Sequence, residues 1–200
     1  MSGSPSSVFP LELPSPALVA LALSLTIYLL SQLGSYQPPA LVTGIVLVCG
    51  AVVQLMYALY GHQRGDSRTA AILLPFGIFW LSLVSYNVFP ELGLGRHPNA
   101  ITMFSYLSLW GFFVAILFLG SFRRSLAAQI FFGSLVFTLL SLSMNHLRDD
   151  QVFLVIGCLC GLFSALTAGY IAVAQMVNQR LQRELIPLGH RDGMVEEGRD

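Results

Sequence analysis

The sequence predicts an all-α integral membrane protein in which six transmembrane helices form one bundle, with both termini on the cytoplasmic side. Of its 200 residues, 55% are hydrophobic and only 10% are charged, whereas about a quarter of the residues in a soluble domain are charged. The chain also contains six apolar runs, each long enough to cross a bilayer as a helix of roughly 20 residues. Lipid is therefore the solvent for most of this chain.

Short polar or Pro/Gly-rich segments separate the apolar runs and set the bounds of the predicted helices. The helices are expected at residues 16–35, 40–62, 69–89, 100–121, 125–147 and 151–178. The loops between them are too short to fold as a second domain. We therefore expect one transmembrane domain over residues 16–178, a cytoplasmic N-terminal segment at 1–15 and a cytoplasmic tail at 179–200.

The distribution of basic residues predicts the orientation, and all ten of them are Arg. With the N-terminus inside, the cytoplasmic side carries Arg64, Arg68, Arg123, Arg124, Arg180, Arg183, Arg191 and Arg199. Only Arg96 and Arg148 fall on the other side. Because basic residues near helix ends stay in the cytoplasm, both termini are expected there, with the protein in the plasma membrane.

The last predicted helix carries small residues at every fourth position, namely Gly157, Gly161, Ala165 and Gly169. In lipid, helices associate largely by close backbone approach at small residues. This stripe therefore predicts tight packing against a neighbouring helix, either inside the bundle or across a boundary between subunits.

Several of the apolar runs also carry polar or aromatic residues at helical spacing. In chain order, the candidates for a solute path are Ser24, Tyr28, Gln54, Phe76, Trp80, Tyr106, Leu135, Thr138 and Asn145. Polar groups within a membrane tend to face the bundle interior or a water path. The alternative is local: a hydroxyl can bond the carbonyl one turn earlier, an amide can join two helices, and the rings can be plain packing residues.

The sequence does not assemble the residues needed for catalysis or metal binding. All ten Asp and Glu residues fall in predicted loops or ends, which argues against a pump that carries protons on a buried carboxylate. Cys158 and Cys160 are two residues apart in one helix and so point to nearly opposite faces. We expect no enzyme activity, no cofactor, no metal site and no nucleic-acid partner.

Several segments, in order, resemble the acetate uptake transporter family, which includes bacterial succinate/acetate permeases and fungal proteins linked to acetate uptake and ammonia export. The matching segments are Gly50 to Gln54, Gly65 to Ser67, Phe76 to Ser82, Pro98 to Ala100, Tyr106 to Gly111, Asn178, and Leu185 to Gly189. The resemblance as a whole covers about residues 15–189, nearly the whole chain. The chain is thereby identified as a divergent member of that family.

The resemblance implies a hexameric ring of six-helix protomers, each with its own solute path narrowed midway by apolar side chains. The family constriction has a Phe on the first helix, a Tyr on the third and a Leu on the fifth. The corresponding positions here are Ser24, Phe76 and Leu135. Only the Leu is kept.

Other departures from the family remove an amide and two acids. The Asn that opens the family's signature on the first helix corresponds to Ser15, and Glu residues on the second and sixth helices correspond to Gly61 and Gln175. Without these acids, a coupled proton is expected to travel with the substrate or through His and water.

These observations predict a permease or channel for acetate or a related short-chain carboxylate such as succinate. Solute would pass Phe76 and Leu135, and the groups expected to replace water around it are Ser24, Gln54, Thr138 and Asn145. Two alternatives remain open. One is a channel for a small neutral or cationic solute such as ammonia, ammonium, urea or an amide, and the other is a non-transporting membrane subunit or sensor.

Overall fold

The computed structural model describes residues 13–122, 125–183 and 185–189. This part of the chain forms α1 (Ser15–Gln32), α2 (Ala40–Gln63), α3 (Ser67–Asn87), the 3₁₀ helix η1 (Pro90–Leu92), α4 (Ala100–Ser121), α5 (Leu126–Arg148) and α6 (Gln151–Leu181). All six α-helices are long and apolar enough to cross a membrane. The predicted fold class, an all-α bundle of six transmembrane helices, is confirmed.

Local sequence signals determine where most of the helices begin and end. Four α-helices start after a residue whose side chain accepts a backbone N–H from the first turn; these residues are Asp66, Asn99, Ser125 and Asp150. Such caps satisfy donors that have no partner within the helix. The first helix ends three residues before the predicted bound. Gly34 adopts φ +71° just beyond it, a left-handed conformation that commonly ends helices.

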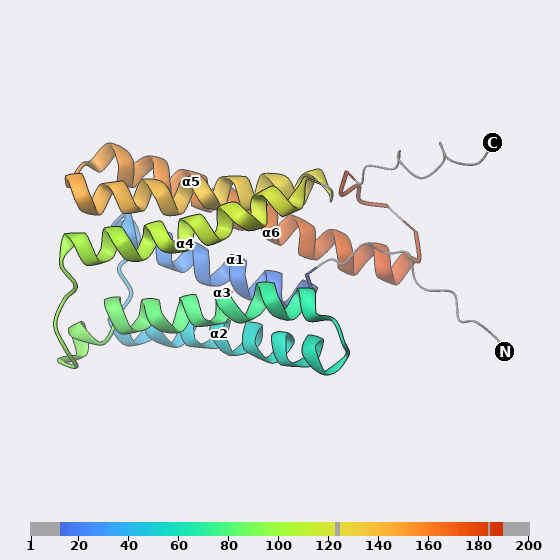
Figure 1. Ribbon diagram of the computed structural model, residues 1–200, viewed down its shortest axis with the longest axis horizontal. Helices are drawn as coiled ribbons and strands as arrows, with labels where there is room; N and C mark the ends of the chain where they lie inside the picture. Colours follow the sequence, from blue (N-terminus) through green and yellow to red (C-terminus); the bar gives the residue numbers. More distant parts are fainter. Residues whose placement is uncertain (1–12, 123–124, 184, 190–200) are drawn as a thin grey trace.

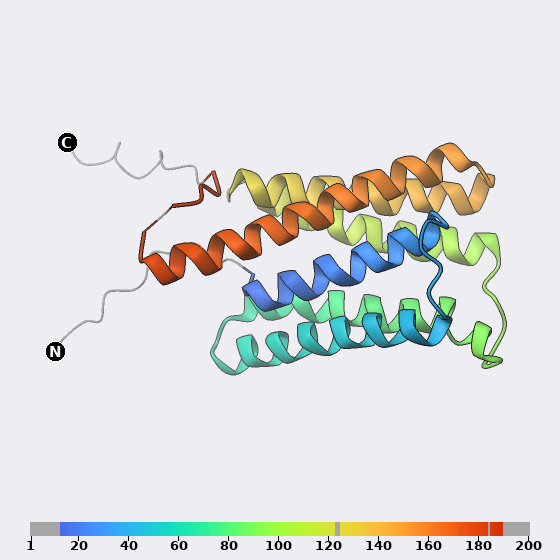
Figure 2. The same ribbon diagram turned by 180° about the vertical axis from the view of Figure 1, so that it is seen from behind.

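Consecutive α-helices run in opposite directions along an elongated bundle (Figure 1). α2 packs beside α3, α4 packs beside α5, and α6 lies between α5 and α1 (Figure 2). α1 in turn contacts α2. Because the number of crossings is even, the start of α1 and the end of α6 lie at the same end of the bundle.

The bundle separates the described arginines into two groups. The end that holds the start of α1 carries Arg64, Arg68, Arg180 and Arg183, and the opposite end carries Arg96 and Arg148. The other predicted cytoplasmic arginines, Arg123, Arg124, Arg191 and Arg199, lie outside the described residues. The assignment of the first end to the cytoplasm remains a prediction from the sequence.

Small residues let α6 approach two neighbouring helices at once. A Cβ added to Gly157 would lie 3.0 Å from Cγ of Leu142 on α5. A Cβ added to Gly161 would overlap the side chain of Leu29 on α1 and lie 2.8 Å from Cγ2 of Thr138 on α5. The first half of the stripe therefore packs inside the bundle, against α1 and α5 together.

The two residues in the second half of the stripe differ in how closely they are packed. Ala165 is 3% exposed, whereas a Cβ added to Gly169 would meet no atom within 4 Å. Gly169 therefore makes no close packing contact within the described part of the chain.

Replacing Gly161 by Ala is expected to lower the Tm of the purified protein by several degrees, because overpacking a tight contact costs about 1–3 kcal/mol. The matched control is Gly169→Ala, which adds the same methyl to the same helix without a close contact and improves helix propensity. This variant should leave the Tm unchanged or slightly higher. Thermal unfolding in detergent measures both, and equal losses would contradict the described packing.

Residues 185–189 return to the bundle beyond the end of α6. The Asn178 side-chain oxygen accepts the backbone N–H of Leu185 and of Ile186, each at 2.9 Å, and its Nδ2 donates to the Ile186 carbonyl at 2.9 Å. The Leu126 N–H at the start of α5 donates to the Gly189 carbonyl at 3.1 Å. The predicted tail thus begins with three further helical residues and a segment held against α5, while residues 190–200 lie outside the described part.

Candidate solute path

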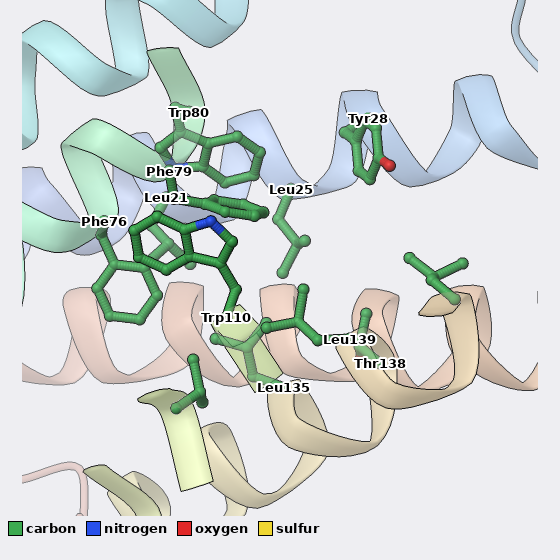
Figure 3. Close-up of a pocket in the computed structure, with 12 residues that line it drawn as sticks. Leu21, Leu25, Tyr28, Phe76, Phe79, Trp80, Trp110, Leu135, Thr138 and Leu139 are labelled. Carbon is green, nitrogen blue, oxygen red and sulfur yellow. The ribbon is translucent and has the colours of Figure 1, made fainter. Parts of the chain in front are cut away.

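A cavity lies inside the bundle between α1, α3, α4 and α5 (Figure 3). Its wall consists of Leu21, Leu25, Tyr28, Phe76, Phe79, Trp80, Trp110, Val114, Leu135, Thr138, Leu139 and Leu142. None of these side chains is charged. The centre of a water molecule can reach only about 20 Å³ of this space. The cavity is therefore a narrow, uncharged point near the middle of each contributing helix.

Helical spacing brings the wall residues of each helix onto one face. On α1, residues 21, 25 and 28 follow one another by four and three positions, and on α5 residues 135, 138 and 142 follow one another by three and four. Residues three and four positions apart share a helix face. The sequence of each helix therefore determines which residues enter the cavity together, once packing has selected the face.

Aromatic rings close the side of the cavity formed by α3 and α4 (Figure 3). The ring centroids of Phe79 and Trp80 are 5.0 Å apart, and those of Phe79 and Trp110 are 5.3 Å apart. Phe76 meets Phe113 edge to face at 6.2 Å. The facing wall on α1 and α5 consists mostly of leucines, together with Tyr28 and Thr138. A solute at this level would therefore touch aromatic rings on one side and mainly aliphatic chains on the other.

Two of the polar side chains in this wall, Thr138 and Trp80, differ in whether their donor groups have a hydrogen-bond partner on the protein. The Thr138 hydroxyl donates to the Ser134 carbonyl of its own helix at 2.8 Å. The indole N–H of Trp80 is buried and has no partner on the protein. An unpaired buried donor costs about 1–3 kcal/mol. Trp80 is therefore a wall residue with unmet capacity to donate to a solute or water.

The structure brings five of the predicted path residues to the cavity, namely Tyr28, Phe76, Trp80, Leu135 and Thr138. Ser24 is not among the wall residues. Its hydroxyl donates to the Val46 carbonyl of α2 at 3.4 Å, and a Cβ added to Gly50 of α2 would overlap it. The expected constriction position on the first helix therefore faces α2, and α1 presents Leu21, Leu25 and Tyr28 to the cavity instead.

Tyr106 and Asn145 also lie beside the cavity rather than in its wall. The Tyr106 hydroxyl donates to the Phe79 carbonyl at 3.1 Å and lies 2.7 Å from the Ser82 hydroxyl. Asn145 is half-buried, three residues beyond the wall residue Leu142 and near the end of α5. Tyr106 therefore contacts the wall residue Phe79, whereas Asn145 lies about one turn beyond the wall along α5.

Gln54 lies where α1, α2 and α3 meet. Two neighbours of Gln54 along α2 show this. A Cβ added to Gly50 of α2 would overlap Ser24 of α1, and a Cβ added to Gly77 of α3 would lie 3.2 Å from the Ala51 carbonyl of α2. Gln54 itself is 0% exposed, and neither its Oε1 nor its Nε2 has a partner on the protein. Such an amide is costly in an apolar interior, and Gln54 is not among the wall residues of the cavity.

Sequence reasoning missed several residues of the wall. Leu21 and Leu25 share the helical face of Tyr28, and Trp110 follows Tyr106 by one turn. This spacing was a usable signal. It carried no weight alone because leucines and a tryptophan are equally common on lipid-facing surfaces of membrane helices.

Two positions at which this chain departs from the resembled family lie together. The Ser15 hydroxyl of α1 donates to Oε1 of Gln175 on α6 at 2.9 Å, and both side chains are buried. The Nε2 group of Gln175 has no partner on the protein. An uncharged hydroxyl–amide pair therefore joins α1 and α6 near the end of the bundle where α1 begins.

Charged and metal-binding groups do not gather around the cavity. The acidic residues of the described ranges, Asp66, Glu91, Asp149 and Asp150, lie outside the α-helices. Among the described residues, no three His, Cys, Asp or Glu side chains lie close enough to hold a metal ion together.

Six helices of membrane length around a narrow, uncharged cavity place this chain among the integral membrane proteins of the helix-bundle class. The particular relationship follows from comparison with known sequences. The chain belongs to the GPR1/FUN34/yaaH family, whose profile matches residues 5–187. The resemblance drawn from the ordered sequence segments is confirmed.

Known proteins are similar to this chain in sequence, and one solved structure is similar to it in fold. The succinate-acetate/proton symporter SatP of Escherichia coli strain K12 is 25% identical over 177 residues, which are 88% of this chain and 94% of that protein. An uncharacterized protein of Methanothermobacter thermautotrophicus is 21% identical over 182 residues, 87% of this chain and 89% of its own. The structure of the bacterial acetate channel SatP superposes with a TM-score of 0.82 at 25% identity, covering 90% of this chain and 100% of that chain.

These relatives bear on the class of activity. A symporter and a channel move solutes and are not enzymes, which agrees with the sequence-based expectation. The family-level activity that they indicate is the transport of acetate and succinate.

Proposed function

We propose that this protein is a permease or channel that passes acetate or a related short-chain carboxylate, including succinate, through a narrow path in each protomer. The observation that carries the proposal is the interior cavity. Its wall combines Phe76 and Leu135 with the unpaired indole N–H of Trp80. A small carboxylate loses part of its water at the apolar wall, and the indole N–H replaces one of the lost hydrogen bonds.

Amide groups lie on both sides of the apolar narrowing along the bundle. Gln54 lies in the half of α2 nearer the end where α1 begins, and Asn145 lies near the opposite end of the bundle. An amide N–H can donate to a carboxylate. In our proposal Gln54 and Asn145 bind the solute before and after the narrow point, and Tyr28 and Thr138 belong to the wall that it passes.

A neutral path also has a consequence for proton coupling. Within the described residues, the α-helices contain no Asp or Glu. In our proposal a proton that accompanies the solute crosses on the acid itself or through His and water.

Purified protein in proteoliposomes is expected to take up labelled acetate faster than empty vesicles of the same lipid. Uptake is measured at acidic and neutral pH, because the neutral acid crosses lipid unaided and raises the background in acid. Excess unlabelled succinate should compete. A rate no better than that of empty vesicles at both pH values would reject the proposal.

A second candidate is a channel for a small neutral or cationic solute such as ammonia, ammonium, urea or an amide. One observation favours it: the cavity wall contains no cationic side chain that would attract a carboxylate. Competition separates the two candidates. Flux that is blocked by ammonium or urea and indifferent to acetate and succinate supports the second candidate.

The assembly belongs to the proposal as well. The family resemblance motivates a homo-hexameric ring, and the arginine asymmetry motivates a plasma-membrane orientation with both termini in the cytoplasm. Crosslinking in membranes that yields only monomers would count against the ring. Labelling of a cysteine introduced at Arg96 by an impermeant reagent added outside cells tests the orientation.

A further inference from the structure

α3 and α4 differ from the other consecutive helix pairs. The backbones of α1 and α2, α2 and α3, α4 and α5, and α5 and α6 approach closely, but those of α3 and α4 do not. Close approach elsewhere uses small residues, such as Gly77 between α3 and α2 and Gly111 between α4 and α5. The boundary between α3 and α4 is therefore held mainly by side chains.

Aromatic rings fill this boundary, which we call the α3–α4 seam and define by the rings of Phe76, Phe79 and Tyr86 on α3 and of Tyr106, Trp110 and Phe113 on α4. The centroids of Tyr86 and Tyr106 lie 4.8 Å apart, and the rings of Phe79 and Tyr106 stack with an angle of 10° between their planes. Contacts between rings are worth about 0.5–1.5 kcal/mol each beyond the area that they bury and are not hydrogen bonds. The seam can therefore widen more easily than a contact between closely packed backbones.

A single side chain ties the two helices together by hydrogen bonds within the described residues. The Tyr106 hydroxyl lies 3.1 Å from the Phe79 carbonyl, to which it donates, and 2.7 Å from the Ser82 hydroxyl. We call this pair of contacts the Tyr106 bridge. Phe79 is itself part of the cavity wall, so the bridge fixes α4 to α3 at a residue that lines the path.

The cavity is too small for a carboxylate to pass unless one of its walls moves. Its small free space suits a water molecule rather than a carboxylate with its methyl group. Phe76, Phe79 and Trp110 belong both to the seam and to the wall. Widening the seam therefore widens the cavity directly.

We propose that the α3–α4 seam is the moving wall of the solute path and that the Tyr106 bridge limits how far it opens. Tyr106 is thus a positioning residue that determines the largest solute admitted and does not itself bind solute. This inference rests on the proposed function for its statement about solutes, but its statement about helix separation does not.

The variant Tyr106→Phe removes the bridge and keeps the ring. No buried group loses its last partner, because the Ser82 hydroxyl still donates to the carbonyls of its own helix, Ile78 at 2.8 Å and Phe79 at 2.9 Å. The matched control is Ser143→Ala. Ser143 forms a similar hydroxyl bridge from α5 to α4, 2.9 Å from the Phe104 carbonyl, but it joins two helices whose backbones pack closely.

Helix separation is measured by spin labels on the exposed positions Ser85→Cys of α3 and Ser105→Cys of α4. An excess of unlabelled protein ensures that only pairs within one chain contribute. The labelled protein lacks the native cysteines Cys49, Cys158 and Cys160. Tyr106→Phe is expected to lengthen or broaden the distance distribution, Ser82→Ala to change it in the same direction by less, and Ser143→Ala to leave it unchanged.

Solute size is measured by uptake of butyrate relative to acetate in proteoliposomes at neutral pH. Because each methylene in an apolar pocket changes discrimination by roughly tenfold or more, Tyr106→Phe should raise the butyrate-to-acetate ratio by roughly tenfold, and Ser143→Ala should not change it.

An unchanged distance distribution overturns the inference, whatever the uptake shows. A changed distance with an unchanged ratio overturns the role in selectivity. If the distance changes and wild-type protein takes up no acetate, the proposed function fails and the Tyr106 bridge stands.

Discussion

The single variants Phe76→Ala and Leu135→Ala are each expected to raise acetate flux by roughly tenfold or more and to admit larger carboxylates, since each removes several carbon atoms from the wall of an apolar pocket. Phe76 and Leu135 are both 4% exposed and face the cavity from α3 and α5. Truncating either side chain enlarges the cavity. Uptake of acetate and butyrate into proteoliposomes gives both quantities.

Loss of packing has to be separated from widening of the path. Large-to-small changes in a core cost about 2–5 kcal/mol, so a variant can leak because it is unstable. Phe131→Ala and Leu47→Ala are suitable controls, because these side chains are 1% and 0% exposed and do not line the cavity. They should lose similar stability without a gain in flux. Unchanged flux in folded Phe76→Ala and Leu135→Ala would favour the non-transporting subunit or sensor.

Replacing Gln54 by Leu is expected to move stability and transport in opposite directions. Neither amide atom of Gln54 has a partner on the protein, and each unpaired buried group costs about 1–3 kcal/mol. An apolar side chain of similar size removes that cost, so the Tm should rise by a few degrees. Acetate uptake should fall about tenfold if the amide supplies a hydrogen bond worth about 1.4 kcal/mol to the solute as it passes.

Gln175→Leu is the matched control for this result. Gln175 is also a buried helical glutamine, but its Oε1 accepts the Ser15 hydroxyl. Its loss leaves that hydroxyl unpaired, so no gain in Tm is expected. A Gln54→Leu variant that is destabilised and transports normally would show that the amide has a structural role and lies off the solute path.

The sequence by itself determined the number, order and bounds of the helices. These features depend on properties read along the chain: an apolar run long enough to cross a bilayer, and caps such as Asp66 and Asn99 that start a helix. The predicted bounds fall within three residues of those in the structure. The ordered segments from Gly50 to Gly189 also identified the family, because matching them requires only the order and spacing of residues along the chain.

Only the tertiary structure decided which face of each helix meets the cavity. A membrane helix is apolar all round, so its pattern does not distinguish the lipid-facing side from the interior. Ser24 and Leu25 are adjacent and equally plausible, and packing turned Ser24 toward α2 and Leu25 toward the cavity. In the same way, the Tyr106 hydroxyl donates to the Phe79 carbonyl of α3, and Trp110 rather than Tyr106 lines the cavity. Contacts between helices that are distant in the sequence determine which side chains face the cavity. Such contacts leave no periodic signal in the sequence of any one helix.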